Sequence, residues 1–414
     1  MSRSRIREIR ESEERHRGML RQQVSSLSSW VEVDLGLVRR NVLEIKKWIP
    51  QSCKIAAVVK ANAYGHGAVE IGKELLGCGI ELLVVAYVEE GIELRLSGIK
   101  QATPIYLLSS FTTGQIDDIL RFNLIPSISN IEQARILAKK VYKRGERIKV
   151  NVKVDTGLSR FGVDYDETGP FLEGLSKLKN VEIEGIYTHF ATAGEGDNEF
   201  LREQLSRFKK VLETAEKMGV EFRFKHAAGS DALACLPESY LNMVRPGLLP
   251  LGIYSLHQPK RDMDLKPVMS FKTRVVLLRK IRKGTSVGYG RTYIAEKDTV
   301  IAVCLVGYSD GYPRILSNRA EVLIGHHRYP VAGEISLSAM MIEVGENSNV
   351  RVGDEVTLIG RCGHEEITVQ ELAGKAETCV DEICMINPRI PRVYIKGGHC
   401  FLRNAITSKQ NLPV

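Results

Sequence analysis

The chain has 414 residues, of which 43% are hydrophobic and 26% charged, and its formal net charge is +8. A chain of this length usually forms more than one hydrophobic core, so we expect two domains. No apolar run approaches the ~20 residues of a membrane-spanning helix, and the N-terminus lacks the apolar core of a signal peptide. These features argue against a membrane protein and predict a cytoplasmic one.

Charge and cysteine patterns exclude further classes of function. Seven arginines lie among the first 21 residues, and four glutamates interrupt them. This mixture favours a solvated helix or a frayed tail over an arm that binds nucleic acid, so we assign residues 1–28 to a charged extension and expect no nucleic-acid partner. The eight cysteines form no C-x-x-C pair, which predicts reduced thiols and no metal site.

The next part of the chain alternates short β-rich runs with amphipathic helical patterns. The β-rich runs lie at 54–62, 80–87, 103–109, 124–129, 148–156, 181–190, 221–230 and 243–254. Such alternation implies a parallel sheet, and eight repeats suggest a closed (β/α)8 TIM-like barrel of the α/β class over residues 29–260. An open doubly wound sheet is the weaker alternative, because no G-x-G-x-x-G motif follows the first strand.

After residue 260 the pattern changes. A polar segment with two prolines, 257–267, separates the two parts of the chain. Beyond it strand-like runs follow one another, punctuated by turn residues, and only "TVQELAGKA" has a helical pattern. We therefore predict a mostly β domain over residues 261–395 and a weakly structured tail over 396–414.

Polar residues stand where the predicted barrel strands end. Barrel enzymes place their catalytic groups at the C-terminal ends of the strands. At these ends the sequence has Lys60, Lys153, Asp155, His189, His226, Ser230 and Arg245. Any one of them is more often a structural residue, but the convergence of the set on one rim indicates an active site.

Lys60 ends the run "KIAAVVK", which is otherwise apolar after its first residue. A buried ammonium is costly unless it is paired, neutralised or used covalently, and desolvation favours the nucleophilic neutral amine. The segment "RPGLLPLG" follows the eighth predicted strand, and its Gly247 exposes backbone N–H groups where barrels commonly bind phosphate. Ser230 adds a hydroxyl. Lysine and phosphate cradle together suggest pyridoxal 5′-phosphate (PLP).

Seven segments, in order, resemble those of the bacterial alanine racemase family. They are "AVVKANAYGHG", "VKVDTGLSRFGV", "YTHFAT", "HAAGS", "NMVRPG", "VGYGRTY" and "VGYSDGYPR". The resemblance covers about residues 30–395, and the first motif is specific even alone. It implies a PLP-binding barrel followed by a β-domain, and it suggests that the N-terminal strand "SWVEVD" joins the β-domain.

The resemblance also implies how the cofactor is held. Lys60 would bind PLP covalently, and Arg245 would face the pyridine nitrogen and keep it unprotonated. The remaining contacts would be Tyr64, Ser230 and Gly247 at the phosphate, His226 behind Arg245, and His189 beside the ring.

Racemisation requires proton transfer on both faces of the α-carbon, and therefore two opposed bases. The resemblance makes Lys60 one base and Tyr289, in the β-domain, the other. A phenol needs nearby cations to act as a base at neutral pH. In the family this tyrosine reaches into the partner subunit's barrel, so a homodimer with shared active sites is implied.

Substrate binding is the next implication. Arg160 would fix the carboxylate of a small amino acid, with Leu337 and Tyr308 nearby. In "VNVKVD" the alternation of a strand places Lys153 on the face opposite the valines, which we expect to be the barrel interior. The matching lysine of the family is carbamylated and orients the arginine, and we carry this over to Lys153 as a hypothesis.

The chain departs from the family pattern in three places. The segment "GEISLSA" replaces "GRICMD", so that Leu337 stands for a methionine and Ser338 for an acid. Pro388 stands where the family has a tyrosine that narrows the pocket. Gly194 stands where the family has an acidic residue at the pocket entrance, whereas the entrance residues Tyr308 and Arg314 are kept. We therefore predict an alanine racemase with a looser pocket, open to serine or other amino acids.

Three other functions compete with this interpretation. A related PLP-binding barrel without clear catalysis lacks a β-domain, and decarboxylases of the same fold carry a C-terminal cysteine motif that this chain lacks. A racemase-like PLP-binding protein that has lost activity is the third. Optical rotation with L-alanine or L-serine separates all three.

Overall fold

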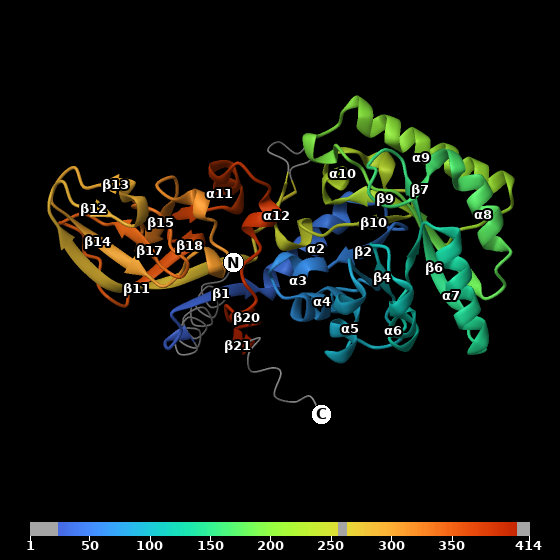
Figure 1. Ribbon diagram of the computed structural model, residues 1–414, viewed down its shortest axis with the longest axis horizontal. Helices are drawn as coiled ribbons and strands as arrows, with labels where there is room; N and C mark the ends of the chain where they lie inside the picture. The colour runs from blue at the N-terminus through green and yellow to red at the C-terminus, as the bar shows by residue number, and fades with distance from the viewer. Residues whose placement is uncertain (1–23, 256–262, 404–414) are drawn as a thin grey trace, which may run out of the picture. The chain divides into compact units, whose positions relative to one another are not determined.

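The computed structural model describes residues 24–255 and 263–403 (Figure 1). Most of the charged extension and part of the predicted boundary lie outside these residues. The chain divides into two compact units, one of residues 38–266 and one that combines residues 1–37 with 267–414. The second unit therefore joins both ends of the chain.

The 38–266 unit is built on parallel strands. Its main strands are β2 (Lys54–Val58), β3 (Leu82–Val85), β4 (Ile105–Leu107), β5 (Ser127–Ile128), β6 (Ile148–Asp155), β8 (Val181–Tyr187), β9 (Phe224–Gly229) and β10 (Met243–Arg245). They are ordered β4-β3-β2-β10-β9-β8-β6-β5, and a short strand, β7 (Val163–Asp164), pairs with β6. This is the strand order of a barrel opened between β4 and β5.

Backbone contacts close that gap. Tyr106 of β4 forms a parallel bridge with Ile125, just before β5. The Leu107 N–H donates to the Ile125 carbonyl at 2.9 Å, and the Ile125 N–H donates to the Ile105 carbonyl at the same distance. The predicted eight-stranded barrel is therefore confirmed, and the open doubly wound sheet is excluded.

Helices follow the strands around the outside of the barrel (Figure 1). They are α2 (Leu35–Trp48), α4 (Ala68–Gly77), α5 (Val88–Leu96), α6 (Ile116–Arg121), α7 (Ile131–Lys143), α8 (Thr168–Ser176), α9 (Glu199–Lys217) and α10 (Ser230–Cys235). From α4 to α9 each helix contacts the next. The side chain of Asn198 caps α9 by accepting from the Leu201 N–H at 2.9 Å, and the buried stripe of α9 includes Leu201, Leu205 and Phe208. Amphipathic faces thus cover the sheet.

The other unit is mostly β structure, as predicted. Its main sheet contains β1 (Ser29–Asp34), β11 (Met269–Ile281), β14 (Thr299–Cys304), β15 (Glu321–Ile324), β16 (His327–Pro330), β17 (Met340–Glu343), β18 (Glu355–Cys362), β19 (Glu365–Ile367), β20 (Arg392–Lys396) and β21 (His399–Arg403). A small hairpin is formed by β12 (Ser286–Val287) and β13 (Tyr293–Ile294). The helices of this unit are α11 (Val369–Ala376) and α12 (Val380–Ile383).

Strand β11 organises this sheet. Over Met269–Val275 its residues alternate between buried and half-buried, which is the two-residue period of a strand with one face in a core. It pairs with β1 and β18 along this part and with β14 farther on. Strand β1 therefore lies in the sheet of the C-terminal unit and not in the barrel.

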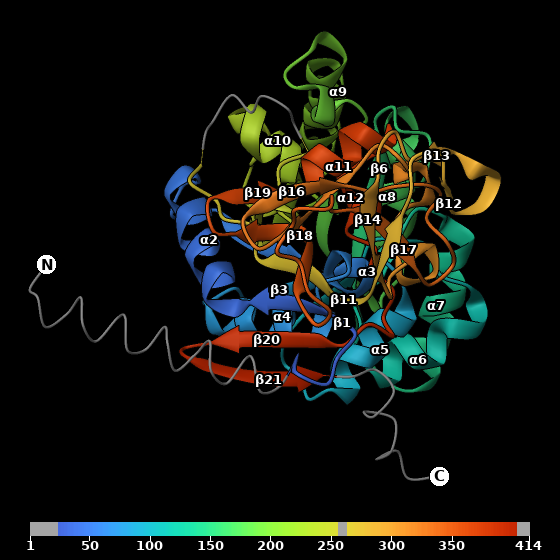
Figure 2. The same cartoon turned by 90° about the vertical axis from the view of Figure 1, so that its left-hand side faces the viewer.

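The sheet extends into the segment that we assigned to a tail. Strand β21 pairs antiparallel with β20, and Figure 2 shows the two as red arrows side by side. Tyr394 and Phe401 stack across this pair, with ring centroids 5.4 Å apart. Across both described stretches of chain, no helix is long and apolar enough to span a membrane.

Candidate active site

Lys60 lies at the C-terminal end of β2, where it begins the short helical segment α3 (Lys60–Tyr64). The four residues after it, Ala61–Tyr64, have φ values of 50–55° and form a left-handed turn. Such a conformation costs roughly 1–2 kcal/mol for each residue with a Cβ atom. The motif therefore places Lys60 at the rim of the barrel. The unfavourable backbone conformation that follows Lys60 must be stabilised by specific contacts.

A group of polar atoms next to this turn has the composition of an anion-binding cradle. The Ser230 Oγ accepts hydrogen bonds from the N–H groups of Gly247 at 2.9 Å and Leu248 at 3.1 Å. The Tyr64 hydroxyl lies so close to Gly247 that any Cβ atom there would overlap it. Backbone N–H groups, two hydroxyls and a required glycine therefore converge, which is the donor set that a phosphate group needs.

Arg245, His226 and Tyr187 form the buried wall of the site. Arg245 donates to His226 Nδ1 at 2.8 Å and to the Thr188 and Ala227 carbonyls at 2.7 and 3.0 Å. The pKa of His226 lies well below 6.5, because burial and then Arg245 disfavour a second proton. His226 is therefore neutral, and its Nδ1 accepts. The ring of Tyr187 stacks on it with centroids 4.9 Å apart.

Lys153 stands inside the barrel on β6, with its side chain buried. Its Nζ lies 5.3 Å from the centroid of Tyr187 and 5.4 Å from that of Phe161. Burial, together with the positive charges of the nearby Arg160 and Arg245, lowers the pKa of Lys153 to about 7. Lys153 is therefore far more easily deprotonated than an ordinary lysine.

His189 lies next to these cations as a neutral ring. Burial is the main cause that lowers its pKa well below 6.5, and the positive charges of Arg245, Lys153, Arg160 and Lys60 lower it further. Its ring lies beside Gly229, which immediately precedes Ser230. The structure thus brings together the predicted barrel residues: Lys60, Tyr64, Lys153, Arg160, His189, His226, Ser230, Arg245 and Gly247.

The other predicted residues belong to the C-terminal unit. Tyr289 begins a single turn, Tyr289–Arg291, and is 70% exposed. Leu337 and Tyr308 are also exposed, at 54% and 45%. Since Tyr289 and Lys60 stand in different units, neither unit alone holds both proposed bases.

Three loops of the C-terminal unit meet around Leu337. The Leu337 carbonyl accepts from the Ser309 N–H at 3.0 Å and from its hydroxyl at 2.7 Å. The Asn387 N–H donates to the Asp310 carbonyl at 3.0 Å, and its side-chain amide donates to the Ser309 carbonyl at 2.8 Å. Pro388 is exposed directly after Asn387. Leu337 and Pro388, two of the departures from the family pattern, therefore both lie next to the turn around Ser309.

Sequence reasoning missed two contributors to the site. Tyr187 lies within "YTHFAT", yet only its contacts with His226, Lys153 and Arg245 reveal its position. Glu90 of α5 accepts a hydrogen bond from the Ala61 N–H at 2.5 Å. A glutamate in the first turn of a helix is common, so its sequence position carried no functional signal.

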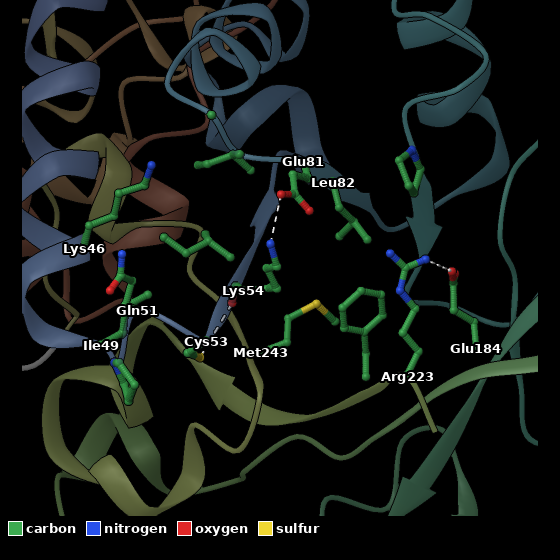
Figure 3. A pocket seen from close by; sticks show the side chains of 16 residues that line it. Lys46, Ile49, Gln51, Cys53, Lys54, Glu81, Leu82, Glu184, Arg223 and Met243 are labelled. Atoms are coloured by element: carbon green, nitrogen blue, oxygen red, sulfur yellow. Dashed lines mark hydrogen bonds and ion pairs between the residues drawn. The ribbon is translucent and has the colours of Figure 1, made fainter. Parts of the chain in front are cut away.

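A cavity of about 340 Å³ lies at the opposite end of the barrel (Figure 3). It is lined by residues that begin strands, such as Lys54 of β2 and Leu82 of β3, with Met243 of β10. Four of its charged groups form two ion pairs, with Lys54 2.9 Å from Glu81 and Arg223 3.5 Å from Glu184, and Lys46 donates to the Cys78 carbonyl at 2.9 Å. In barrel enzymes this end serves stability, whereas chemistry uses the other. We therefore place the active site at the Lys60 rim.

Comparisons with known proteins show which proteins this chain resembles. Sequence profiles described as "Alanine racemase, N-terminal domain" and "Alanine racemase, C-terminal domain" match residues 33–255 and 268–394. The alanine racemase of Halothermothrix orenii is 40% identical over 371 residues, which cover 88% of this chain and 96% of that protein. An alanine racemase structure from Clostridium difficile 630 has a TM-score of 0.87 at 32% identity and covers 92% of this chain and 99% of that one. A histidine racemase structure from Leuconostoc mesenteroides has a TM-score of 0.80 at 27% identity, with coverages of 89% and 98%.

Proposed function

The chain belongs to the alanine racemase family, and we therefore propose that it interconverts L- and D-alanine in the cytoplasm. The observation that carries this proposal is the convergence of Lys60 with the anion cradle of Ser230, Gly247 and Tyr64 on one rim of the barrel. A lysine beside a phosphate-binding site is the arrangement that PLP chemistry requires.

The barrel residues fit PLP. The cradle donors would hold its phosphate, and the Lys60 amine would bind its aldehyde carbon. When bound, PLP withdraws electrons from the α-carbon of an amino acid and so makes its proton easier to remove. Arg245 would face the ring nitrogen. Because burial lowers the pKa of Arg245 only to about 10, it remains a cation at neutral pH and keeps that nitrogen unprotonated.

Two groups would move the α-proton. We assign one face of the α-carbon to the Lys60 amine and the other to the Tyr289 hydroxyl. Since these residues stand in different units, and Tyr289 is 70% exposed, we propose that a homodimer completes each site, with Tyr289 supplied by the partner subunit. Arg245 would then provide the positive charge that a phenolate needs nearby, whereas His189, whose pKa lies well below 6.5, is neutral and contributes none.

The direct test is exchange of the α-hydrogen. Protein loaded with PLP in deuterated water should convert L-alanine to D-alanine and place deuterium on the α-carbon, as followed by chiral chromatography and proton NMR. The same must hold from D-alanine. If neither isomer exchanges, the chain is a PLP-binding protein without racemase activity, or it does not use PLP at all; the ultraviolet–visible spectrum of the loaded protein separates these cases.

We further propose that Lys153 is carbamylated and that the resulting anion orients Arg160 toward the substrate carboxylate. A neutral amine is required to add CO2, and the pKa of Lys153, lowered to about 7, supplies one at neutral pH. The buried cations around it would favour the carbamate anion.

The expected result is a carbamate signal in carbon-13 NMR after incubation with labelled bicarbonate. Acidification below the pKa of Lys153 should remove it. The signal should be absent in Lys153→Ala, whose kcat/KM should fall about 10–100-fold because Arg160 loses its orientation. Lys149→Ala is the matched control, since Lys149 lies on the same strand and pairs with Glu184 at 2.9 Å. Absence of the signal in the wild-type protein would refute the modification.

A second candidate, a racemase of broader specificity, is favoured by the loops around Leu337. Pro388 replaces a larger and more polar tyrosine of the family pattern, Leu337 replaces a methionine, and both border the Ser309 turn. The similarity to a histidine racemase shows that a related fold accepts a larger side chain. We expect kcat/KM for L-serine within about 100-fold of that for L-alanine, because a pocket that accommodates an added hydroxyl discriminates against it by no more than about 10²-fold.

A panel of L-alanine, L-serine and L-histidine measures this specificity. Pro388→Tyr should narrow the pocket and lower kcat/KM for serine and histidine more than for alanine. Arg389→Ala, at the neighbouring exposed position, is the control. A steep fall from alanine to every larger substrate in the wild-type protein would contradict the broad-specificity candidate and leave a strict alanine racemase.

A further inference from the structure

The left-handed turn after Lys60 requires an external support. Its residues Ala61, Ala63 and Tyr64 all carry a Cβ atom at positive φ, so the turn costs roughly 1–2 kcal/mol per residue relative to ordinary backbone. Contacts within the segment offset part of this cost. The Gly65 N–H donates to the Ala61 carbonyl at 3.0 Å, and the Asn62 side chain accepts from the Ala68 N–H at 2.9 Å.

Glu90 supports the start of the turn from a different element. One oxygen of its carboxylate accepts from the Ala61 N–H at 2.5 Å. The other accepts from the N–H groups of Ala86 at 2.7 Å and Tyr87 at 3.1 Å, which link the end of β3 to α5. One carboxylate therefore ties the ends of two adjacent barrel strands together, and hydrogen bonds to an ionised acceptor are about twice as strong as neutral ones.

The peptide that Glu90 holds is the one that follows Lys60. The Ala61 N–H belongs to the same planar unit as the Lys60 carbonyl, so this hydrogen bond fixes the direction in which the Lys60 backbone leaves β2. The direction of the backbone in turn limits the positions that the Lys60 amine can reach. The phosphate cradle is formed by other parts of the chain, the residues that follow β9 and β10. The Lys60 amine must therefore be aligned with a cradle that its own segment does not position alone.

We propose that Glu90 is a positioning residue for Lys60, acting through the Lys60–Ala61 peptide to aim the amine at the cofactor's reactive carbon. The inference rests on the proposed role of Lys60 in binding PLP. Glu90 touches neither substrate nor cofactor in this assignment. Its effect is to keep the Lys60 amine within reach of the cofactor's reactive carbon. This position determines how fast the amine attacks that carbon and how well the amine later accepts a proton.

Hydrogen exchange tests the contact without any cofactor. In the apo protein, the Ala61 amide should exchange at least about 10-fold faster in Glu90→Ala than in the wild type, with Glu90→Gln intermediate because a neutral oxygen still accepts. Glu89→Ala is the matched control, since Glu89 lies beside Glu90 on the same helix and accepts from the Gln115 side chain at 2.9 Å. Unchanged exchange of the Ala61 amide in Glu90→Ala would overturn the proposal.

The second readout is the rate at which Lys60 captures PLP. The amine adds to the aldehyde and releases water, and borohydride then reduces the bond so that peptide mass spectrometry counts the product on Lys60. Capture should slow at least about 10-fold in Glu90→Ala and recover partly in Glu90→Gln, whereas Glu89→Ala should match the wild type. The kcat for alanine should fall similarly, with KM changed by less than about 2-fold.

A backbone substitution separates positioning from helix capping. Glu90→Ala also removes the cap of α5, and it could act by unfolding that helix. Replacing Ala61 by lactic acid exchanges its N–H for an ester oxygen and leaves the contacts of Glu90 with Ala86 and Tyr87 intact. Slow capture with an unchanged melting temperature supports positioning, and capture at the wild-type rate refutes it. If wild-type Lys60 captures no PLP, the proposed function fails instead.

Discussion

Replacing Lys60 by alanine is expected to reduce kcat for alanine racemisation by at least about 10⁴-fold, because the variant loses both the covalent bond to PLP and one of the two bases. The protein should remain folded. Lys60 stands at the barrel rim among Lys153, Arg160 and Arg245, so its removal deletes a positive charge from a region already rich in them. We expect a melting temperature of the apo protein equal to or above that of the wild type.

The charge deletion has its own signature. The positive charge of Lys60 is one of the causes that lower the pKa of His189 and of Lys153. In Lys60→Ala both pKa values should therefore rise toward their ordinary values, and Lys153 should be protonated over a wider range of pH. Proton NMR of His189 and the pH dependence of carbamate formation at Lys153 measure these two shifts.

The control for Lys60 is the lysine at the opposite end of β2. Lys54 begins β2 at the other end of the barrel, where it pairs with Glu81 at 2.9 Å. Lys54→Ala should keep wild-type activity and bind PLP normally. Residual activity of Lys60→Ala above about one hundredth of the wild-type value would contradict the assignment of Lys60 as both the cofactor lysine and a base.

The sequence was sufficient to predict the barrel and to group most residues of the candidate site. Strand–helix alternation implies a parallel sheet, and the C-terminal ends of parallel strands meet at one edge, so polar residues at those ends had to converge. This is why Lys60, Ser230 and Arg245, distant in the sequence, could be grouped before any coordinates were known. Arg245 and His226 lie on neighbouring strands and pair at 2.8 Å.

The left-handed turn and its support could not be predicted in the same way. Positive φ is usually signalled by glycine or asparagine, and in "KANAY" only Asn62 belongs to that class. Glu90 reaches Ala61 from 29 positions away, through tertiary packing that no local pattern encodes. Strand β21 was missed for a related reason, since its pairing with β20 decides its structure more than its own composition does.

The second large effect concerns Tyr289. Tyr289→Phe is expected to lower kcat at least about 10³-fold in both directions, because each direction needs one base to remove the α-proton and the other to deliver a proton on the opposite face. The variant should still capture PLP at the wild-type rate, since Tyr289 does not belong to the barrel unit that holds the cradle. Loss of turnover with intact capture distinguishes Tyr289 from Lys60.

Mixing the two inactive variants should restore activity if each site is shared between subunits. Refolding Lys60→Ala and Tyr289→Phe together in equal amounts makes half of all dimers mixed. In a mixed dimer one site carries both substitutions, and the other combines an intact Lys60 with the partner subunit's intact tyrosine. Half of the dimers are mixed, and each mixed dimer has one working site out of two, so about a quarter of wild-type activity should return.

The control for this recovery is the variant that carries both substitutions in one chain. When the double variant is refolded with wild-type protein, the mixed dimer holds two sites with one defect each, so activity should fall to the fraction of wild-type dimers, about a quarter. If Lys60 and Tyr289 instead met within one chain, mixing the single variants would restore nothing, and the double variant would lower activity only to about one half. The two experiments together thus decide which chain supplies the second base.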